Sequence, residues 1–137
     1  MNDAAPPTGL STGMAKSLMV EIARKLEHLA RTGEPGAIDL RSLPMTARDR
    51  EELDELLGRG DVEATLHVAG ESEIRETRYA GVWWVRHGGS GGHTAAELIE
   101  ITPVPDILAA HPDDIADAAA SIAAETALRT EEETAHA

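Results

Sequence analysis

The sequence contains no cysteine and no phenylalanine, and its only aromatic residues are Tyr79, Trp83 and Trp84. Without cysteine the chain forms no disulfide and offers no thiolate, so a metal would depend on histidine and carboxylate alone. No run of about 18 apolar residues is present, which predicts no transmembrane helix. The first residues also lack the basic and apolar segments of a secretory signal. We therefore expect a cytoplasmic protein.

Basic side chains are also scarce. Twelve lysines and arginines stand against 25 aspartates and glutamates, which gives a formal net charge of −13. This charge repels phosphate backbones and anionic lipid, so we expect no nucleic-acid and no membrane partner. Proteins with basic patches are the favoured partners. The acidity is concentrated towards the C-terminus, where the segment from Asp106 onward has eight acids and one base, Arg129.

The length of 137 residues predicts one small domain with extensions. Residues 1–11, which include two prolines, are expected to form a disordered leader. Residues 12–108 carry the periodic patterns of the domain. Residues 109–129 predict an alanine-rich acidic helix that docks weakly, because few large apolar side chains accompany the alanines. Residues 130–137 are expected to be a disordered acidic tail.

The first part of the domain has helical patterns. Apolar residues recur on one arc at about 100° per residue over residues 13–31, which predicts an amphipathic helix. Thr46 and Asp49 have the spacing of a capping box and predict a second, shorter helix that ends at Gly58. A short extended piece, residues 38–43, separates the two helices.

The middle of the chain has the patterns of strands. Alternating apolar and polar residues predict strands over residues 62–68, 73–87 and 94–102, with a bulge or bend in the second at Gly81. The glycine-rich run 88–92 predicts the loop between the last two strands. We infer a small α+β fold, in which a three-stranded antiparallel meander has two or three helices packed mainly on one face.

The sequence offers little catalytic chemistry. No serine has the G-x-S-x-G spacing of a nucleophile elbow, and no lysine follows the glycine run 88–92 to hold phosphates. We therefore expect no enzyme activity, no catalytic residue and no cofactor, and we assign no metal ligand. His87 and His93 flank the glycine loop and could meet across the hairpin, with Glu97 nearby. A histidine-based metal site is therefore the alternative to a binding module without metal.

The segment 73–87 contains every aromatic residue of the chain together with several arginines. Neighbouring residues of a strand point to opposite faces, so one of Trp83 and Trp84 anchors the core while the other lies on the far face. We predict that Trp84 is the exposed one and that it belongs to a protein-binding surface. The predicted partner-binding residues are Trp84, Arg86, Arg75, Arg78 and Tyr79. Alternatively, the C-terminal segment folds back over the exposed tryptophan.

Several blocks of the sequence follow, in order, the pattern of one known family. They include Glu73-Ile-Arg-Glu-Thr, Gly81-Val-Trp-Trp-Val-Arg-His87 and Val104-Pro-Asp-Ile-Leu108. The chain resembles the C-terminal conserved region of the HupH/HyaF family of hydrogenase expression proteins. The family pattern has a polar residue in the second tryptophan position, which supports an exposed Trp84.

The resemblance implies an accessory protein of nickel–iron hydrogenase maturation without enzyme activity. It implies a chaperone with one of two binding partners. The partner is either an immature hydrogenase subunit, namely the small iron–sulfur subunit, or another assembly factor. One alternative is a histidine-based nickel or iron carrier of the same pathway, which would use His87, His93 and the acidic tail. The other is an unrelated acidic module that binds a basic protein. We also expect a homodimer, because a helix stripe containing Leu18, Ile22 and Leu29 and both edges of the sheet would otherwise be exposed.

Overall fold

The structure of the chain is a computed structural model that describes residues 9–67 and 70–135. Its regular elements are α1 (Met14–Thr32), β1 (Gly36–Asp39), α2 (Ala47–Leu57), β2 (Glu63–His67), β3 (Glu71–Glu76), β4 (Val82–Gly88), β5 (Thr94–Ile101) and α3 (Pro112–Ala135). The chain divides into two compact units, the first up to Pro103 and the second from Val104. Most of the leader expected over residues 1–11, and the last two residues of the expected tail, lie outside the described residues.

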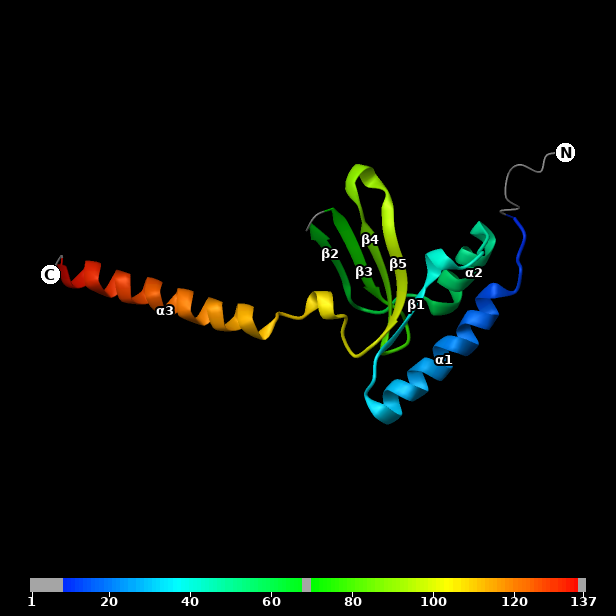
Figure 1. Cartoon of the computed structure of the whole chain (residues 1–137), viewed down its shortest axis with the longest axis horizontal. Coiled ribbons are helices and arrows are strands. Elements are labelled where there is room, and N and C mark those ends of the chain that lie inside the picture. The colour runs from blue at the N-terminus through cyan, green and yellow to red at the C-terminus, as the bar shows by residue number, and fades with distance from the viewer. Residues whose placement is uncertain (1–8, 68–69, 136–137) are drawn as a thin grey trace. The chain divides into compact units, whose positions relative to one another are not determined.

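The five strands form one antiparallel sheet in the order β1-β5-β4-β3-β2, so β1 and β2 are its edges (Figure 1). The α+β class agrees with the expectation from sequence, but the expectation of a three-stranded sheet is wrong. One additional strand is β1, which pairs with β5 from Gly36 opposite Ile101 to Asp39 opposite Leu98. It begins two residues before the extended piece predicted over residues 38–43 and contains only Ile38 and Asp39 of that piece, which was too short to predict as a strand.

The other additional strand comes from residues 73–87, where one strand was expected and two are present. Thr77 closes a tight turn between β3 and β4. Its backbone N–H and its hydroxyl both donate to the carbonyl of Val82, at 3.0 and 2.9 Å. Gly81 has φ of 86°, in the left-handed region that favours glycine. The expected bend at this glycine is therefore a complete reversal of the chain.

The first two helices form where the sequence places them. The N–H of Gly33, in a left-handed conformation, donates to the carbonyl of Leu29 at 2.8 Å and ends α1. At the start of α2, the hydroxyl of Thr46 accepts from the N–H of Asp49 at 3.0 Å. The carboxylate of Asp49 accepts in return from the N–H of Thr46 at 3.1 Å. The predicted capping box is confirmed.

Helices α1 and α2 pack on one face of the sheet and enclose the main core (Figure 1). The buried residues of this core are Ala15, Leu18, Ile22, Ile38, Leu40, Leu53, Leu57, Val82, Trp84, Ile99 and Ile101. The stripe of α1 assigned to a dimer interface thus packs inside the protomer. The expectation that this stripe is exposed, which was one reason to predict a homodimer, is wrong.

The central strand β4 is buried on both of its faces. Val82 and Trp84 point to the helices, whereas Trp83 and Val85 point to the opposite face. Trp83 is 5% exposed, and its Nε1 donates to the carbonyl of Thr102 at 3.1 Å. The two tryptophans lie on opposite faces as predicted, but neither is exposed.

The second unit contains α3, which begins at Pro112 and runs to Ala135, past the end expected at residue 129. All of its described side chains, residues 112–130, are exposed, including Ile115, Ile122 and Leu128 at 57–68%. Within the second unit, the helix is therefore stabilised by the propensity of its alanines rather than by packing. Neither α3 nor any other helix within the described residues is long and apolar enough to span a bilayer.

Hydrogen bonds tie the segment before α1 to the start of α2. The buried carboxylate of Asp49 accepts from the N–H and the hydroxyl of Thr12, at 2.8 and 2.6 Å. The hydroxyl of Thr46 donates to the carbonyl of Leu10 at 2.7 Å. The hydrogen bonds from Thr12, its hydroxyl first, lower the pKa of Asp49 to about 2.

The lowered pKa of Asp49 makes stability depend on pH in the acid range. A carboxylate whose pKa falls on folding stabilises the folded state above its unfolded pKa, near 3.8, and loses that contribution as the pH falls through about 2. We expect Asp49→Asn to be less stable than the wild type near neutral pH and to lose less stability on acidification. Urea titrations from about pH 6 down to pH 2 measure both effects.

Asp61→Asn is the matched control, because Asp61 is an exposed aspartate of the same unit. Its free energy of unfolding should follow the wild type across the titration. Parallel curves for the wild type and Asp49→Asn would contradict the role given to Asp49.

Candidate functional site

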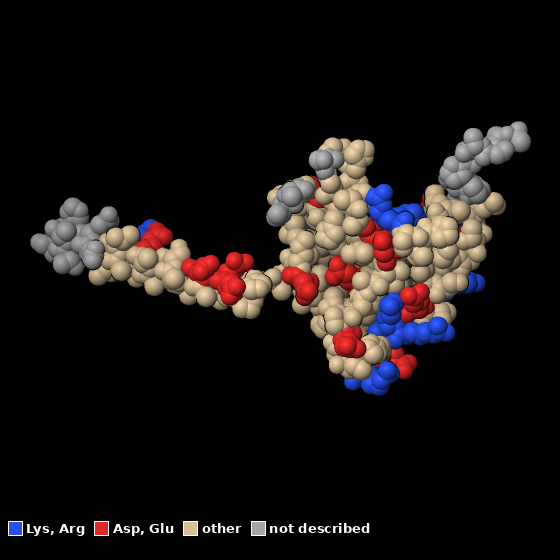
Figure 2. Space-filling model, viewed as in Figure 1, with Lys and Arg blue, Asp and Glu red and all other residues tan. Residues whose placement is uncertain are grey.

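A groove with a volume of about 360 Å³ opens beside α2, over the part of β2, β3 and β4 that the helices leave uncovered. We call it the arginine groove. Its charged lining consists of Arg50, Arg59, Arg75 and Arg86 with Glu51, Asp54, Glu63 and Glu73. A third of the basic side chains of this acidic chain thus gather at one site. Figure 2 shows basic and acidic side chains intermixed on the first unit, whereas the second unit displays mostly acids.

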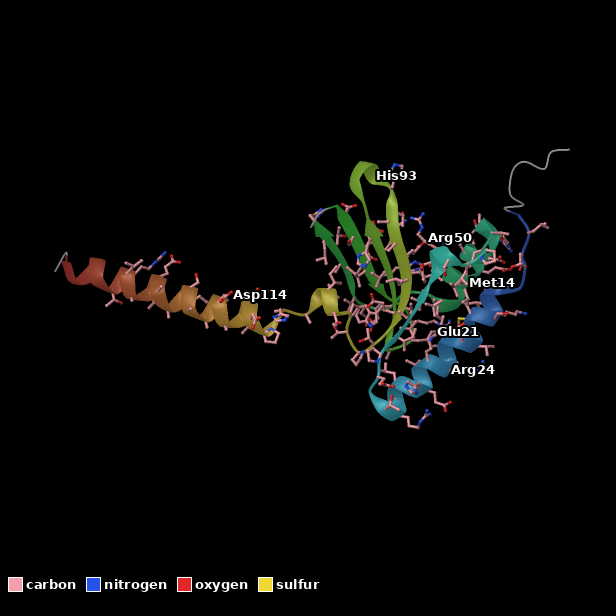
Figure 3. All side chains as sticks on the ribbon, viewed as in Figure 1. Met14, Glu21, Arg24, Arg50, His93 and Asp114 are labelled. Carbon is pink, nitrogen blue, oxygen red and sulfur yellow. The ribbon has the colours of Figure 1, made fainter. Side chains whose placement is uncertain are left out.

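The floor of the groove depends on Trp84 and on Glu97, whose side chain is 7% exposed. Trp84 Nε1 donates to Glu97 Oε2 at 2.7 Å. Arg50, on the side of α2 that faces the sheet (Figure 3), forms an ion pair with the other oxygen, Oε1. A buried carboxylate without partners costs several kcal/mol, so these two contacts satisfy both oxygens of Glu97 in the core.

Arg75 joins the floor to α2. Its guanidinium lies 4.7 Å from the centroid of the Trp84 ring, in a cation–π contact. It donates to Asp54 Oδ1 at 2.5 Å and to the carbonyl of Gly58 at 3.0 Å. Its side chain is only 14% exposed. Burial lowers the pKa of Arg75, and the opposite charge of Asp54 counteracts this effect.

The rim of the groove is more exposed than its floor. Arg86 donates to Glu73 Oε1 at 2.5 Å, and this hydrogen bond raises the pKa of Arg86. Arg59 lies 3.8 Å from Glu63. Exposed ion pairs of this kind contribute about 0–1 kcal/mol each. A partner can therefore replace them with its own charged groups at little cost.

The five residues predicted to bind a partner lie in two adjoining groups, because the side chain of Arg78 lies beside Gly58, whose carbonyl accepts from Arg75. Trp84, Arg75 and Arg86 line the arginine groove. Arg78 and Tyr79 lie at the turn between β3 and β4, where Arg78 Nη2 donates to Tyr79 Oη at 2.7 Å. The prediction that Trp84 is exposed is wrong, because Trp84 is 8% exposed and packs in the main core. Partner binding by these residues stays a prediction.

Sequence reasoning missed Arg50, Asp54 and Glu97 as parts of the site. At 100° per residue, Arg50 and Asp54 share the arc of α2 that contains the buried Leu53 and Leu57. Charged residues on the buried arc of a helix were the available signal. On β5, Glu97 lies on the same face as the buried Ile99 and Ile101. This position was a second signal, because a carboxylate on a buried face must find partners in the core.

The two hairpin histidines do not meet. His87 lies opposite Ala96 on β5, and His93 remains in the loop before that strand. His87 Nδ1 lies 3.1 Å from the hydroxyl of Ser72, on the sheet face opposite to Glu97. Within residues 9–67 and 70–135, no group of three or more histidine, aspartate or glutamate side chains could hold a metal ion.

Comparison with known families gives a clear assignment. The family model described as HupH hydrogenase expression protein, C-terminal conserved region, matches residues 13–128. This match covers more than half of the chain, which therefore belongs to the HupH family of hydrogenase expression proteins. The resemblance noted from the sequence blocks is confirmed.

Individual relatives agree with this assignment. The structure of hydrogenase expression protein HupH from Thiobacillus denitrificans superimposes with a TM-score of 0.81 at 40% identity, over 85% of this chain and 97% of that chain. Hydrogenase expression/formation protein HupH from Rhodobacter capsulatus is 30% identical over 87% of this chain and 43% of its own length. Hydrogenase-1 operon protein HyaF from Escherichia coli is 34% identical over 63% of this chain and 30% of its own length. The chain thus spans less than half the length of these two longer relatives.

The buried position of Trp84 predicts a large effect on stability. Trp84→Ala should lower the free energy of unfolding by about 3–5 kcal/mol, because it leaves a cavity under α2. Trp84→Phe keeps most of the buried ring but removes the donor to Glu97, and should cost about 1–3 kcal/mol. Urea titrations of both variants at neutral pH measure these differences.

Val20→Ala is the control for this series, since Val20 is an exposed apolar residue of α1. It should change the free energy of unfolding by no more than about 0.5 kcal/mol. A Trp84→Ala protein that unfolds at the same urea concentration as the wild type would refute the structural role of the indole.

Proposed function

We propose that this chain is an accessory protein of nickel–iron hydrogenase maturation that binds an immature hydrogenase subunit through the arginine groove. The small iron–sulfur subunit is the proposed client, and binding takes place in the cytoplasm without catalysis. Membership of the HupH family carries this proposal, because the relatives are named hydrogenase expression or formation proteins. The occupant of the groove and its location are our inference.

The construction of the groove supports a binding role. Its floor is fixed by the contacts of Trp84, Arg75 and Glu97, so the shape of the groove is set before a partner arrives. Its rim carries arginines, which are enriched at the energetic centres of protein interfaces because they combine charge, planarity and apolar carbons. A fixed floor lowers the entropic cost of association, and an exchangeable rim provides selectivity.

Such a protein would protect its client by covering part of the client's surface, without a chemical reaction. An immature subunit exposes apolar area that its final partner later covers, and each Å² removed from water contributes about 25 cal/mol before the costs of association. Because the rim pairs are individually weak, the final partner can displace the accessory protein once it covers a larger area.

Reversing one charge on the rim tests the proposal with a close control. Arg59→Glu should weaken binding of the apo small subunit at least about tenfold, by placing two like charges together at the groove. Arg31→Glu on α1 is the control. Arg31 and Arg59 have side chains exposed by 63 and 60%, and each is paired with a glutamate four residues away. Isothermal titration calorimetry with purified apo small subunit measures both variants.

The large hydrogenase subunit and a second maturation factor serve as competing ligands in the same experiment. Preferential binding of either one would refute the small subunit as the client. Equal losses from Arg59→Glu and Arg31→Glu would refute the groove as the binding site, because both variants change the net charge equally.

A further inference from the structure

We propose that the open edge of β2 pairs with the β2 of a second copy of this chain. The two strands run antiparallel with the twofold axis at Thr65, so that two sheets join into one and two arginine grooves meet. The backbone geometry of β2, its side-chain register and its position at the groove support this pairing.

The backbone of β2 presents a free edge. Val62 accepts from the N–H of Glu76 at 2.9 Å, so residue 62 and every second residue after it direct their N–H and C=O groups towards β3. In an antiparallel ladder the intervening residues direct theirs away from the partner strand. These outward residues are Glu63, Thr65 and His67. They offer three donors and three acceptors, and no strand among the described residues pairs with them.

The register centred on Thr65 is complementary to itself. It places Thr65 opposite Thr65, and it places Glu63 opposite His67 of the second copy on both sides of the axis. On the other face, Ala64 lies opposite Leu66. A slip of two residues shortens the paired segment and separates Glu63 from His67, so this register alone uses all five residues of β2.

The neighbouring side chains extend this complementarity. Within one copy, Glu63 lies 3.8 Å from Arg59, and His67 Nδ1 lies 3.7 Å from Glu71. Pairing of Glu63 with His67 of the second copy therefore gives a row in which donors and carboxylates alternate. The row runs from Arg59 and Glu63 of one copy to His67 and Glu71 of the other. No two carboxylates of this row are adjacent.

The other edge of the sheet is less suited to pairing. Strand β1 has four residues and follows Pro35, which has no N–H to donate. The chain passes directly from β1 into a 3-10 turn at Leu40. A second copy at β2 therefore meets the longer and more regular edge.

Pairing at β2 also changes the arginine groove. Glu63 and Thr65 line this groove, so the second copy would add its own Glu63, Thr65 and His67 at the rim. The two grooves would form one continuous site across the twofold axis. A five-residue strand buries less area than the interfaces of permanent dimers, so the association should be reversible and concentration-dependent.

The first test measures association of the full chain by sedimentation velocity from about 5 to 500 μM. We expect a monomer–dimer equilibrium in this range. Thr65→Pro removes the outward donor without breaking a bond to β3 and should weaken the dimer at least about tenfold. Thr65→Val keeps the donor and should associate like the wild type. A wild-type protein that stays monomeric, or equal dimerisation by the two variants, overturns the proposal.

The second test measures the register and does not depend on the proline variant. The chain has no cysteine, so Ala64→Cys and Leu66→Cys each introduce a single thiol. In the proposed register these two positions face each other with Cα atoms about 4.5 Å apart, within the range for a disulfide. Two copies of either variant alone would have their thiol-bearing residues about 7–8 Å apart, beyond it.

Mild oxidation of an equal mixture should therefore give mainly the mixed disulfide, and each variant alone should give much less covalent dimer. A size tag on one variant separates the products by gel electrophoresis. Self-linked dimers as abundant as the mixed dimer, or no covalent dimer in the mixture, would overturn the proposed register.

Discussion

The need to satisfy both oxygens of Glu97, buried beneath α2, is the constraint on which the rest of the first unit depends. Its two oxygens are satisfied from opposite directions, one by Trp84 in the sheet and one by Arg50 in the helix. The carboxylate can be buried only where both partners reach it, so the contact fixes the distance and the rotation of α2 on the sheet. The same contact holds the indole flat under Arg75, and thereby fixes the floor of the arginine groove.

The groove therefore combines two kinds of electrostatic contact that differ in burial. The pairs made by Glu97 and Arg75 each have one buried member, with side chains 7 and 14% exposed, for which the loss of a partner is costly, and they act as structure. The pairs made by Arg86 and Arg59 are open to water, where the loss of a partner costs little, and they are available for exchange. A site built in this way would keep its shape while its outer charges rearranged around the proposed partner.

Local signals predicted the elements that have a local cause. The capping box at Thr46 and the apolar arc of α1 depend on residues a few positions apart, and both were predicted correctly. The five-stranded sheet was not predicted, because the pairing of β1 with β5 joins segments about 60 residues apart, and no local pattern specifies such a pair. The burial of Trp84 escaped prediction for a related reason. Alternation assigns a residue to a face of the sheet, but only the tertiary fold determines that both faces of β4 are covered.

The full exposure of α3 affects how unfolding of this protein is observed. Within its own unit, the helix buries no side chain over residues 112–130. A helix of this kind adds little to the heat capacity of unfolding, and it frays gradually instead of melting in one cooperative step. Far-ultraviolet circular dichroism therefore sums a broad helix–coil transition and the sharper transition of the first unit. The fluorescence of Trp83 and Trp84, both buried in β4, follows the cooperative transition alone.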